Sequence, residues 1–180
     1  MSKRAVFLDR DDTIITNIDY LHHPDLIEFC DGVLDGLRVL KNAGYMLIMV
    51  TNQSGIGRGY ISERRLQEIH RRLNHQLSQL TIPLDAVYFA PDAPREEYPK
   101  EVLRKPGSGM LLQAADEHAL DLQQSFMVGD SYGDIIAGAR AGCTTILINK
   151  NKDTDTWEQQ PDYCVSTFDN AVKIIIRNTR

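Results

Sequence analysis

Residues 5–13 of this 180-residue chain read Ala-Val-Phe-Leu-Asp-Arg-Asp-Asp-Thr, an apolar run that ends abruptly in three carboxylates. A short, wholly apolar run predicts a strand buried on both faces. Carboxylates placed so close together resist sharing one site, so a cation has to offset their charge. An acidic turn exposed to water would look the same in isolation, and this stretch alone leaves both interpretations open.

Four further apolar runs resemble the first in length and in their β-branched or aromatic residues. They are Met46–Val50, Ala86–Phe89, Phe126–Val128 and Thr145–Ile148. Segments of helical period alternate with them, and such alternation predicts a parallel sheet with right-handed crossovers. We therefore expect an α/β fold over residues 1–180, one domain with a single Rossmann-like parallel sheet, helices on both faces and no large cap domain.

Helical periodicity is clearest in the stripe of Leu66, Ile69, Leu73, Leu77 and Leu80, which Ser62 can cap at its start. His70 and His75 fall on this helix and are expected at its surface. The other expected helices are one through Val33–Leu40 before Gly44, one from near Ser108, one through Ile135 that stops at Gly142, and one from Asn170 to about Arg177.

Polar residues follow three of the predicted strands. Asp9 ends the first and Thr51 the second, and Asp130 follows the fourth by one glycine. Parallel sheets bind ligands beyond the carboxyl ends of their strands, so these residues predict a site at one edge. Two further motifs are weak alone: the glycine-rich turn after Thr51 can bind an anion through backbone N–H groups, and Arg104-Lys105 precedes a helix. An ordinary glycine turn and a solvated cation pair are the alternatives.

Taken together, these motifs are far more specific. Carboxylates from two strands can hold a hard divalent cation such as Mg²⁺ through oxygen ligands. Lys105 and Thr51 can then stabilise the charge of a transferring phosphoryl group.

The ordered set DxDxT (9–13), strand-end Thr51, Lys105 and GDxxxD (129–134) resembles the haloacid dehalogenase superfamily of phosphohydrolases, from about Val6 to Ile148. Within it, FLDRD (7–11), VTNQSGIGRGY (50–60), RKPGSGMLLQAA (104–115) and MVGDSYGDI (127–135) look closest to the D-glycero-D-manno-heptose 1,7-bisphosphate phosphatases. Histidinol-phosphate phosphatases are the near relatives.

This resemblance implies that Asp9 is the nucleophile and that Asp11 protonates the leaving oxygen and later activates water. It implies Mg²⁺ bound by Asp9, Asp130 and the backbone carbonyl of Asp11, with Asp134 behind them to orient Lys105. Thr51 and Lys105 would stabilise the phosphoryl group. The residues expected to contact substrate are Asn17, Asp19, Tyr20, Asn52, Gln53, Ser54, Arg58 and Arg104.

The sequence departs from the residue pattern of these phosphatases in two places. Asp12 stands where the heptose branch has glycine. The places of that family's zinc-binding cysteines and histidine hold Ala90, Asp92, Glu101 and Leu103. Zinc needs four ligands in closed geometry, which this set lacks, so we expect no zinc.

Composition narrows the remaining functions. The net charge of −5 argues against nucleic acid as a partner, and no apolar run is long enough to cross a membrane. Three widely spaced cysteines fit a reducing cytoplasm. We expect a cytoplasmic monomer acting on a small sugar phosphate. The alternatives are a histidinol-phosphate phosphatase, a non-catalytic module that binds phosphorylated metabolites, and a phosphotransferase, which would need a lid that the sequence does not show.

Overall fold

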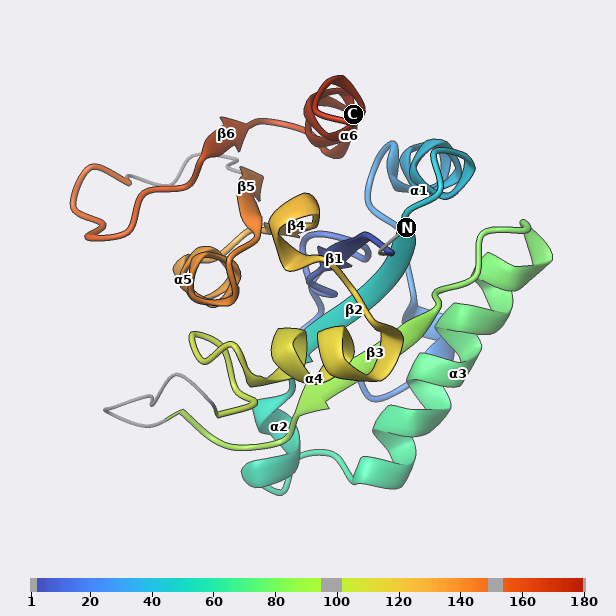
Figure 1. The fold of residues 1–180 in the computed structure, drawn as a ribbon. Helices are drawn as coiled ribbons and strands as arrows, with labels where there is room; N and C mark the ends of the chain where they lie inside the picture. Colours follow the sequence, from blue (N-terminus) through green and yellow to red (C-terminus); the bar gives the residue numbers. More distant parts are fainter. Residues whose placement is uncertain (1–2, 95–101, 149–153, 180) are drawn as a thin grey trace.

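The computed structural model describes residues 3–94, 102–148 and 154–179, which contain a six-stranded parallel sheet flanked by helices (Figure 1). The strand order is β3-β2-β1-β4-β5-β6. The strands are β1 (Ala5–Leu8), β2 (Met46–Asn52), β3 (Ala86–Ala90), β4 (Phe126–Gly129), β5 (Thr144–Ile148) and β6 (Tyr163–Val165). The helices are α1 (Val33–Asn42), α2 (Ser54–Gly57), α3 (Glu63–Gln79), α4 (Gly109–His118), α5 (Tyr132–Ala141) and α6 (Phe168–Arg177), with 3₁₀ turns at Pro24–Leu26 and Leu122–Gln124.

The alternation of side chains along the strands divides the core in two. In β1, Val6 and Leu8 join one cluster, in which they meet residues of α1, α3 and α6. Ala5 and Phe7 join the other, with residues of α4 and α5. Because successive strand residues point to opposite faces, an apolar run without alternation is what a sheet covered on both sides requires. The predicted fold class is confirmed.

Helix ends follow the predicted signals. The Ser62 hydroxyl accepts a hydrogen bond from the backbone N–H of Arg65 at the start of α3. Gly142 ends α5 with a φ of +88°, a conformation that glycine adopts at no steric cost. These caps satisfy backbone groups that a helix leaves unpaired at its ends.

Several details differ from the expectations. Strand β3 is half-buried along most of its length, because it lies at the edge of the sheet and pairs with β2 on one side. The short, largely exposed strand β6 and the single-turn helix α2 were not predicted, since neither has a periodic apolar pattern. Leu80 lies past the end of α3 and is exposed.

The expectation that His70 is a surface residue is wrong. Its side chain is 6% exposed, whereas His75 on the same helix is exposed as predicted. His70 is buried because it lies on the face of α3 that carries the apolar stripe, beside Ile69 and Leu73.

The chain order of the strands places the site. From β1 the chain moves outward through β2 to β3, and then returns to the other side of β1 for β4, β5 and β6. The order therefore reverses between β1 and β4, and a crevice for ligands opens beyond the carboxyl ends of strands at such a point. Asp9 and Asp130 follow these two strands directly. No helix in the described part of the chain is both long and apolar enough to cross a membrane.

The packing of α5 on the sheet predicts an effect on stability. A Cβ atom at Gly138 would lie 2.6 Å from Met127 Cβ and 2.8 Å from Thr145 Cγ2. Gly138→Ala should therefore lower the free energy of unfolding by about 1–3 kcal/mol, through overpacking. Gly133→Ala on the same helix is the matched control, since its Cβ would have no neighbour closer than 3.7 Å. Urea denaturation that shows equal stability for the two variants would contradict this view of the packing.

Candidate active site

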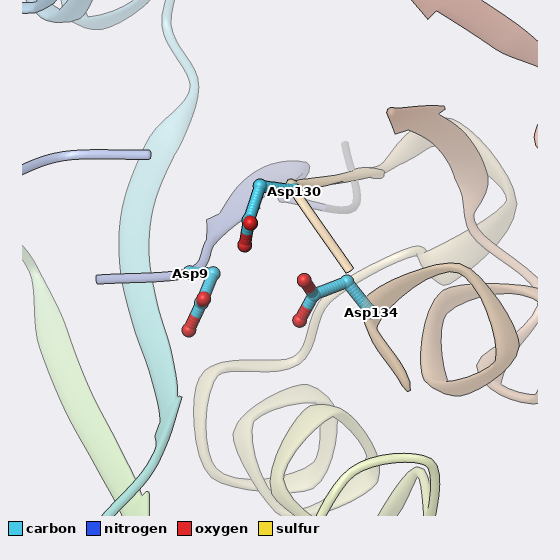
Figure 2. Close-up of side chains that lie close together, drawn as sticks. All are labelled: Asp9, Asp130 and Asp134. Carbon is cyan, nitrogen blue, oxygen red and sulfur yellow. The ribbon is translucent and has the colours of Figure 1, made fainter. Parts of the chain in front are cut away.

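Three carboxylates converge beyond the ends of β1 and β4 (Figure 2). Asp9 follows β1, Asp130 follows β4, and Asp134 lies in the first turn of α5. One oxygen of each lies within 4.8 Å of the others. This is the cluster that the strand-end pattern predicted for Asp9 and Asp130, with Asp134 beside them.

Lys105 supplies the positive charge that this cluster requires. Its buried ammonium lies 2.7 Å from Asp9 Oδ1 and 2.5 Å from Asp134 Oδ1, and it donates to the Val50 carbonyl at 2.8 Å. All three donor positions of the ammonium are thus used. Lys105 lies in the loop between β3 and α4. Its side chain connects this loop to Asp9, which follows β1, and to Asp134, which follows β4.

The charges of the cluster remain unbalanced despite Lys105. Burial, together with the carboxylates of Asp134 and Asp11, raises the pKa of Asp9 to about 7, although the Lys105 ammonium opposes this shift. Burial alone would lower the pKa of Lys105, but the carboxylates of Asp134 and Asp9 outweigh it and raise that pKa. The two raised pKa values have one cause. A single ammonium shared between several carboxylates leaves excess negative charge, which favours the protonated form of both Asp9 and Lys105. The site therefore favours a further positive charge, either a proton or a metal ion.

Asp134 is held from two sides. Its Oδ2 accepts hydrogen bonds from the backbone N–H and the hydroxyl of Ser131, which completes a capping box at the start of α5. Its Oδ1 faces Lys105. A Cβ atom at Gly129 would collide with the Asp134 carboxylate, so glycine at the end of β4 leaves the space that this arrangement needs.

Asp11 belongs to a second network beside the first. The Arg10 guanidinium contacts both oxygens of its carboxylate, at 3.0–3.1 Å. The Gln53 amide donates to Asp11 Oδ2 at 3.1 Å and to Thr51 Oγ1 at 2.8 Å. Gln53 thus links the predicted acid to the predicted phosphoryl-binding hydroxyl.

The Asn52 side chain forms hydrogen bonds with the backbone of Lys105. Its amide donates to the Lys105 carbonyl and accepts from the Lys105 backbone N–H, both at 2.9 Å. This pair of bonds fixes the backbone from which the buried ammonium extends. Among the predicted substrate contacts, Asn52 and Gln53 therefore already have protein partners.

The other residues that were predicted to contact substrate are exposed or half-buried. Tyr20 lies in the segment after β1, and its backbone has a φ of +51°. Its ring packs edge-on against Tyr60, with the ring centroids 4.6 Å apart. Gly55 in α2 leaves room for the Tyr20 ring. Asn17, Asp19 and Arg58 are exposed, and Ser54 is half-buried at the start of α2.

Arg104 is half-buried next to Lys105 and donates to the Asp92 carbonyl at 2.7 Å. This bond reaches the segment in which we expected no zinc site. Ala90 ends β3, and Asp92 and Leu103 are described, but Glu101 lies outside the described residues. Across residues 3–94, 102–148 and 154–179, the three aspartates above form the one group of His, Cys, Asp or Glu arranged to hold a metal.

The donor set of that group fits a hard cation. Asp9 and Asp130 offer carboxylate oxygens at a point of excess negative charge, and magnesium prefers oxygen ligands. Asp134 is held by Lys105 and Ser131, so Asp9 and Asp130 are the better placed of the three to hold such an ion.

Sequence reasoning did not identify the buried charge of Arg10. The signal was present: a basic residue between two site carboxylates in a chain segment whose neighbours are buried. It was missed because the partner that completes its environment, His70, lies 60 residues away on a different element.

The chain is similar to known proteins over nearly its whole length. A family model described as HAD-hydrolase-like matches residues 102–171. The D-glycero-beta-D-manno-heptose-1,7-bisphosphate 7-phosphatase of Haemophilus influenzae is 40% identical over 179 residues, 97% of each chain. That of Pasteurella multocida is 38% identical, over 96% of this chain and 97% of its own.

Solved structures agree with the sequence relatives. D,D-heptose 1,7-bisphosphate phosphatase from B. bronchiseptica, solved with magnesium and phosphate, superposes with a TM-score of 0.84 at 27% identity, over 97% of this chain and 98% of its own. The D,D-heptose 1,7-bisphosphate phosphatase from Burkholderia thailandensis gives a TM-score of 0.69 at 26% identity, over 97% and 99%.

The raised pKa of Asp9 predicts how stability depends on pH. Between its ordinary pKa near 3.8 and the folded value near 7, the folded chain keeps a proton that the unfolded chain has lost. The Asp9 contribution to the free energy of unfolding therefore falls as pH rises through 7. In metal-free buffer, the stability of the wild type minus that of Asp9→Asn should fall between pH 5 and pH 8.

Urea denaturation in EDTA at several pH values measures this difference. Asp19→Asn, which removes an exposed carboxylate in the neighbouring loop, is the control for the loss of one negative charge. A wild-type-minus-Asp9→Asn difference that is flat or rises with pH would show that the buried cluster does not favour an added positive charge.

Proposed function

The chain belongs to the D-glycero-beta-D-manno-heptose-1,7-bisphosphate 7-phosphatase family of haloacid dehalogenase-like phosphatases, and we propose that it removes the 7-phosphate of that sugar bisphosphate with the help of Mg²⁺. The observation that carries this proposal is the group formed by Asp9, Lys105, Asp130 and Asp134 at the reversal of strand order. It combines a proposed nucleophile, a buried ammonium and carboxylate oxygens of the kind that magnesium binds at one point.

The first chemical step uses Asp9. One carboxylate oxygen attacks phosphorus, the P–O bond to the sugar breaks, and an aspartyl-phosphate forms. The departing oxygen takes a proton from the Asp11 carboxyl, because an alkoxide is a poor leaving group. In the second step Asp11 accepts a proton from water, which attacks phosphorus and releases Asp9 and inorganic phosphate.

Lys105 and Thr51 stabilise the phosphoryl group during both steps. The Lys105 ammonium already contacts Asp9 Oδ1, so it lies next to the position where the phosphoryl group becomes attached. The Thr51 hydroxyl ends the neighbouring strand and can donate to a phosphoryl oxygen while it accepts from Gln53. Prearranged donors of this kind stabilise charge that develops in the transition state.

The proposed cation ligands are Asp9, Asp130 and the backbone carbonyl of Asp11. When bound, magnesium would neutralise phosphoryl charge and help orient the phosphate for attack. Its charge would also compensate the carboxylates that raise the pKa of Asp9. The cluster contains no cysteine or histidine, and we propose that catalysis needs no zinc.

Exposed and half-buried side chains are the candidates for recognising the sugar. We propose that Arg104, Arg58, Ser54 and the loop residues Asn17, Asp19 and Tyr20 contact the substrate. The amides of Asn52 and Gln53 hold Lys105, Thr51 and Asp11, so they act by ordering the groups that touch the phosphoryl. We further propose that the protein works as a cytoplasmic monomer.

The choice of substrate is directly testable. With Mg²⁺ present, kcat/KM for the heptose 1,7-bisphosphate should exceed that for histidinol phosphate by ~10-fold or more. Arg58 and Arg104 suit an anionic, hydroxyl-rich substrate, since a guanidinium pairs with phosphate through two hydrogen bonds. Arg104→Ala should slow the bisphosphate while affecting p-nitrophenyl phosphate much less.

Histidinol phosphate carries an amine and an imidazole, which the exposed carboxylate of Asp19 could bind. A preference for histidinol phosphate by the same factor would overturn the proposed substrate and leave the phosphatase chemistry in place.

A further inference from the structure

Arg10 is a buried cation whose side chain takes no part in the phosphoryl site itself. It is 2% exposed, and its Nε and Nη2 atoms contact the Asp11 carboxylate while Nη1 points away from it. Burying a guanidinium is costly unless every N–H group finds a partner. The group that faces Nη1 therefore has a large influence on where the guanidinium can lie.

That group is His70. Its Nε2 lies 3.2 Å from Arg10 Nη1. A guanidinium only donates, so Nε2 has to accept, which makes the imidazole neutral with its proton on Nδ1. Burial and the neighbouring guanidinium lower the pKa of His70 to about 3, in agreement with this assignment.

His70 is itself held rigidly. It lies in the middle of α3, a 17-residue helix, between the core residues Ile69 and Leu73. Its ring meets the Phe89 ring of β3 edge-on, with centroids 6.0 Å apart. The imidazole is thus fixed by a helix and a strand outside the catalytic loop, and it presents one acceptor to Arg10.

We propose that His70 and Arg10 form a positioning pair that holds the Asp11 carboxyl in the orientation needed for proton transfer. This inference rests on the proposed role of Asp11 as general acid. A guanidinium that contacts both oxygens fixes the plane of the carboxyl as well as its place, which a single hydrogen bond does not. Gln53 fixes the same group from the other side, through Oδ2.

The pair connects the segment directly after β1 to α3. A general acid has to meet the leaving oxygen within hydrogen-bond reach, and small displacements of a reacting group are costly to the rate. Asp11 pairs with Ile15 in an isolated β-bridge, but its side chain is 24% exposed, so packing alone leaves the carboxyl some freedom to rotate. The chain from α3 through His70 and Arg10 removes that freedom.

The test compares two aryl phosphates that differ in the leaving group. Phenyl phosphate releases a weakly acidic phenol and depends on the general acid, whereas p-nitrophenyl phosphate releases a far more acidic phenol and depends on it little. The ratio of their kcat/KM values reports only steps up to formation of the aspartyl-phosphate. With Mg²⁺ present, His70→Phe should lower kcat/KM for phenyl phosphate by ~10-fold or more, and for p-nitrophenyl phosphate by less than ~3-fold.

Two further variants keep the test decisive if His70→Phe does not fold. His70→Gln retains an acceptor for Nη1, so its kcat/KM for phenyl phosphate should stay within ~3-fold of that of the wild type. Arg10→Lys keeps the charge but loses the two-oxygen contact, and should reproduce the selective loss. His75→Phe, an exposed position on the same helix, is the matched control and should change neither ester.

Equal losses for the two esters in folded variants, or no loss in any variant, would overturn the positioning role. Neither ester is a sugar, so this outcome is independent of the proposed substrate. A wild type that cleaves both esters but fails on the heptose bisphosphate would overturn that substrate alone.

Discussion

The shared ion pair between Lys105 and the carboxylates of Asp9 and Asp134 is the interaction on which the site depends. Several carboxylates at the ends of buried parallel strands would repel one another, and an unpaired buried ion costs several kcal/mol. One ammonium from the loop before α4 reduces this cost and binds three segments of chain together. Because it leaves the cluster short of positive charge, the same interaction also favours a further positive charge beside Asp9.

Much of the supporting structure can be understood as holding that ion pair in place. Asn52 fixes the Lys105 backbone, and the capping box with Ser131 fixes Asp134. Gly129 leaves room for the Asp134 carboxylate at the end of β4. The sheet topology brings β1 and β4 together, so residues more than 120 positions apart share one site.

The sequence predicted those features that depend on local pattern. Buried strands such as β1 are apolar throughout, and Asp9 and Asp130 stand where strands end, so both fold and cluster were accessible. Strand β6 was not, because it is short, exposed and without alternation. The burial of His70 and the use of the Gln53 amide were equally hidden, since each depends on contacts between distant elements that no local pattern encodes.

In the proposed mechanism the phosphoryl group becomes attached to Asp9, which follows β1 and contacts the buried Lys105 ammonium. The most direct measurement is to quench the enzyme with acid during turnover, reduce it with borohydride and sequence its peptides by mass spectrometry. Borohydride converts an aspartyl-phosphate to homoserine, so we expect homoserine at position 9 and at no other aspartate. Homoserine at another position, or none at all under conditions of rapid turnover, would contradict this mechanism.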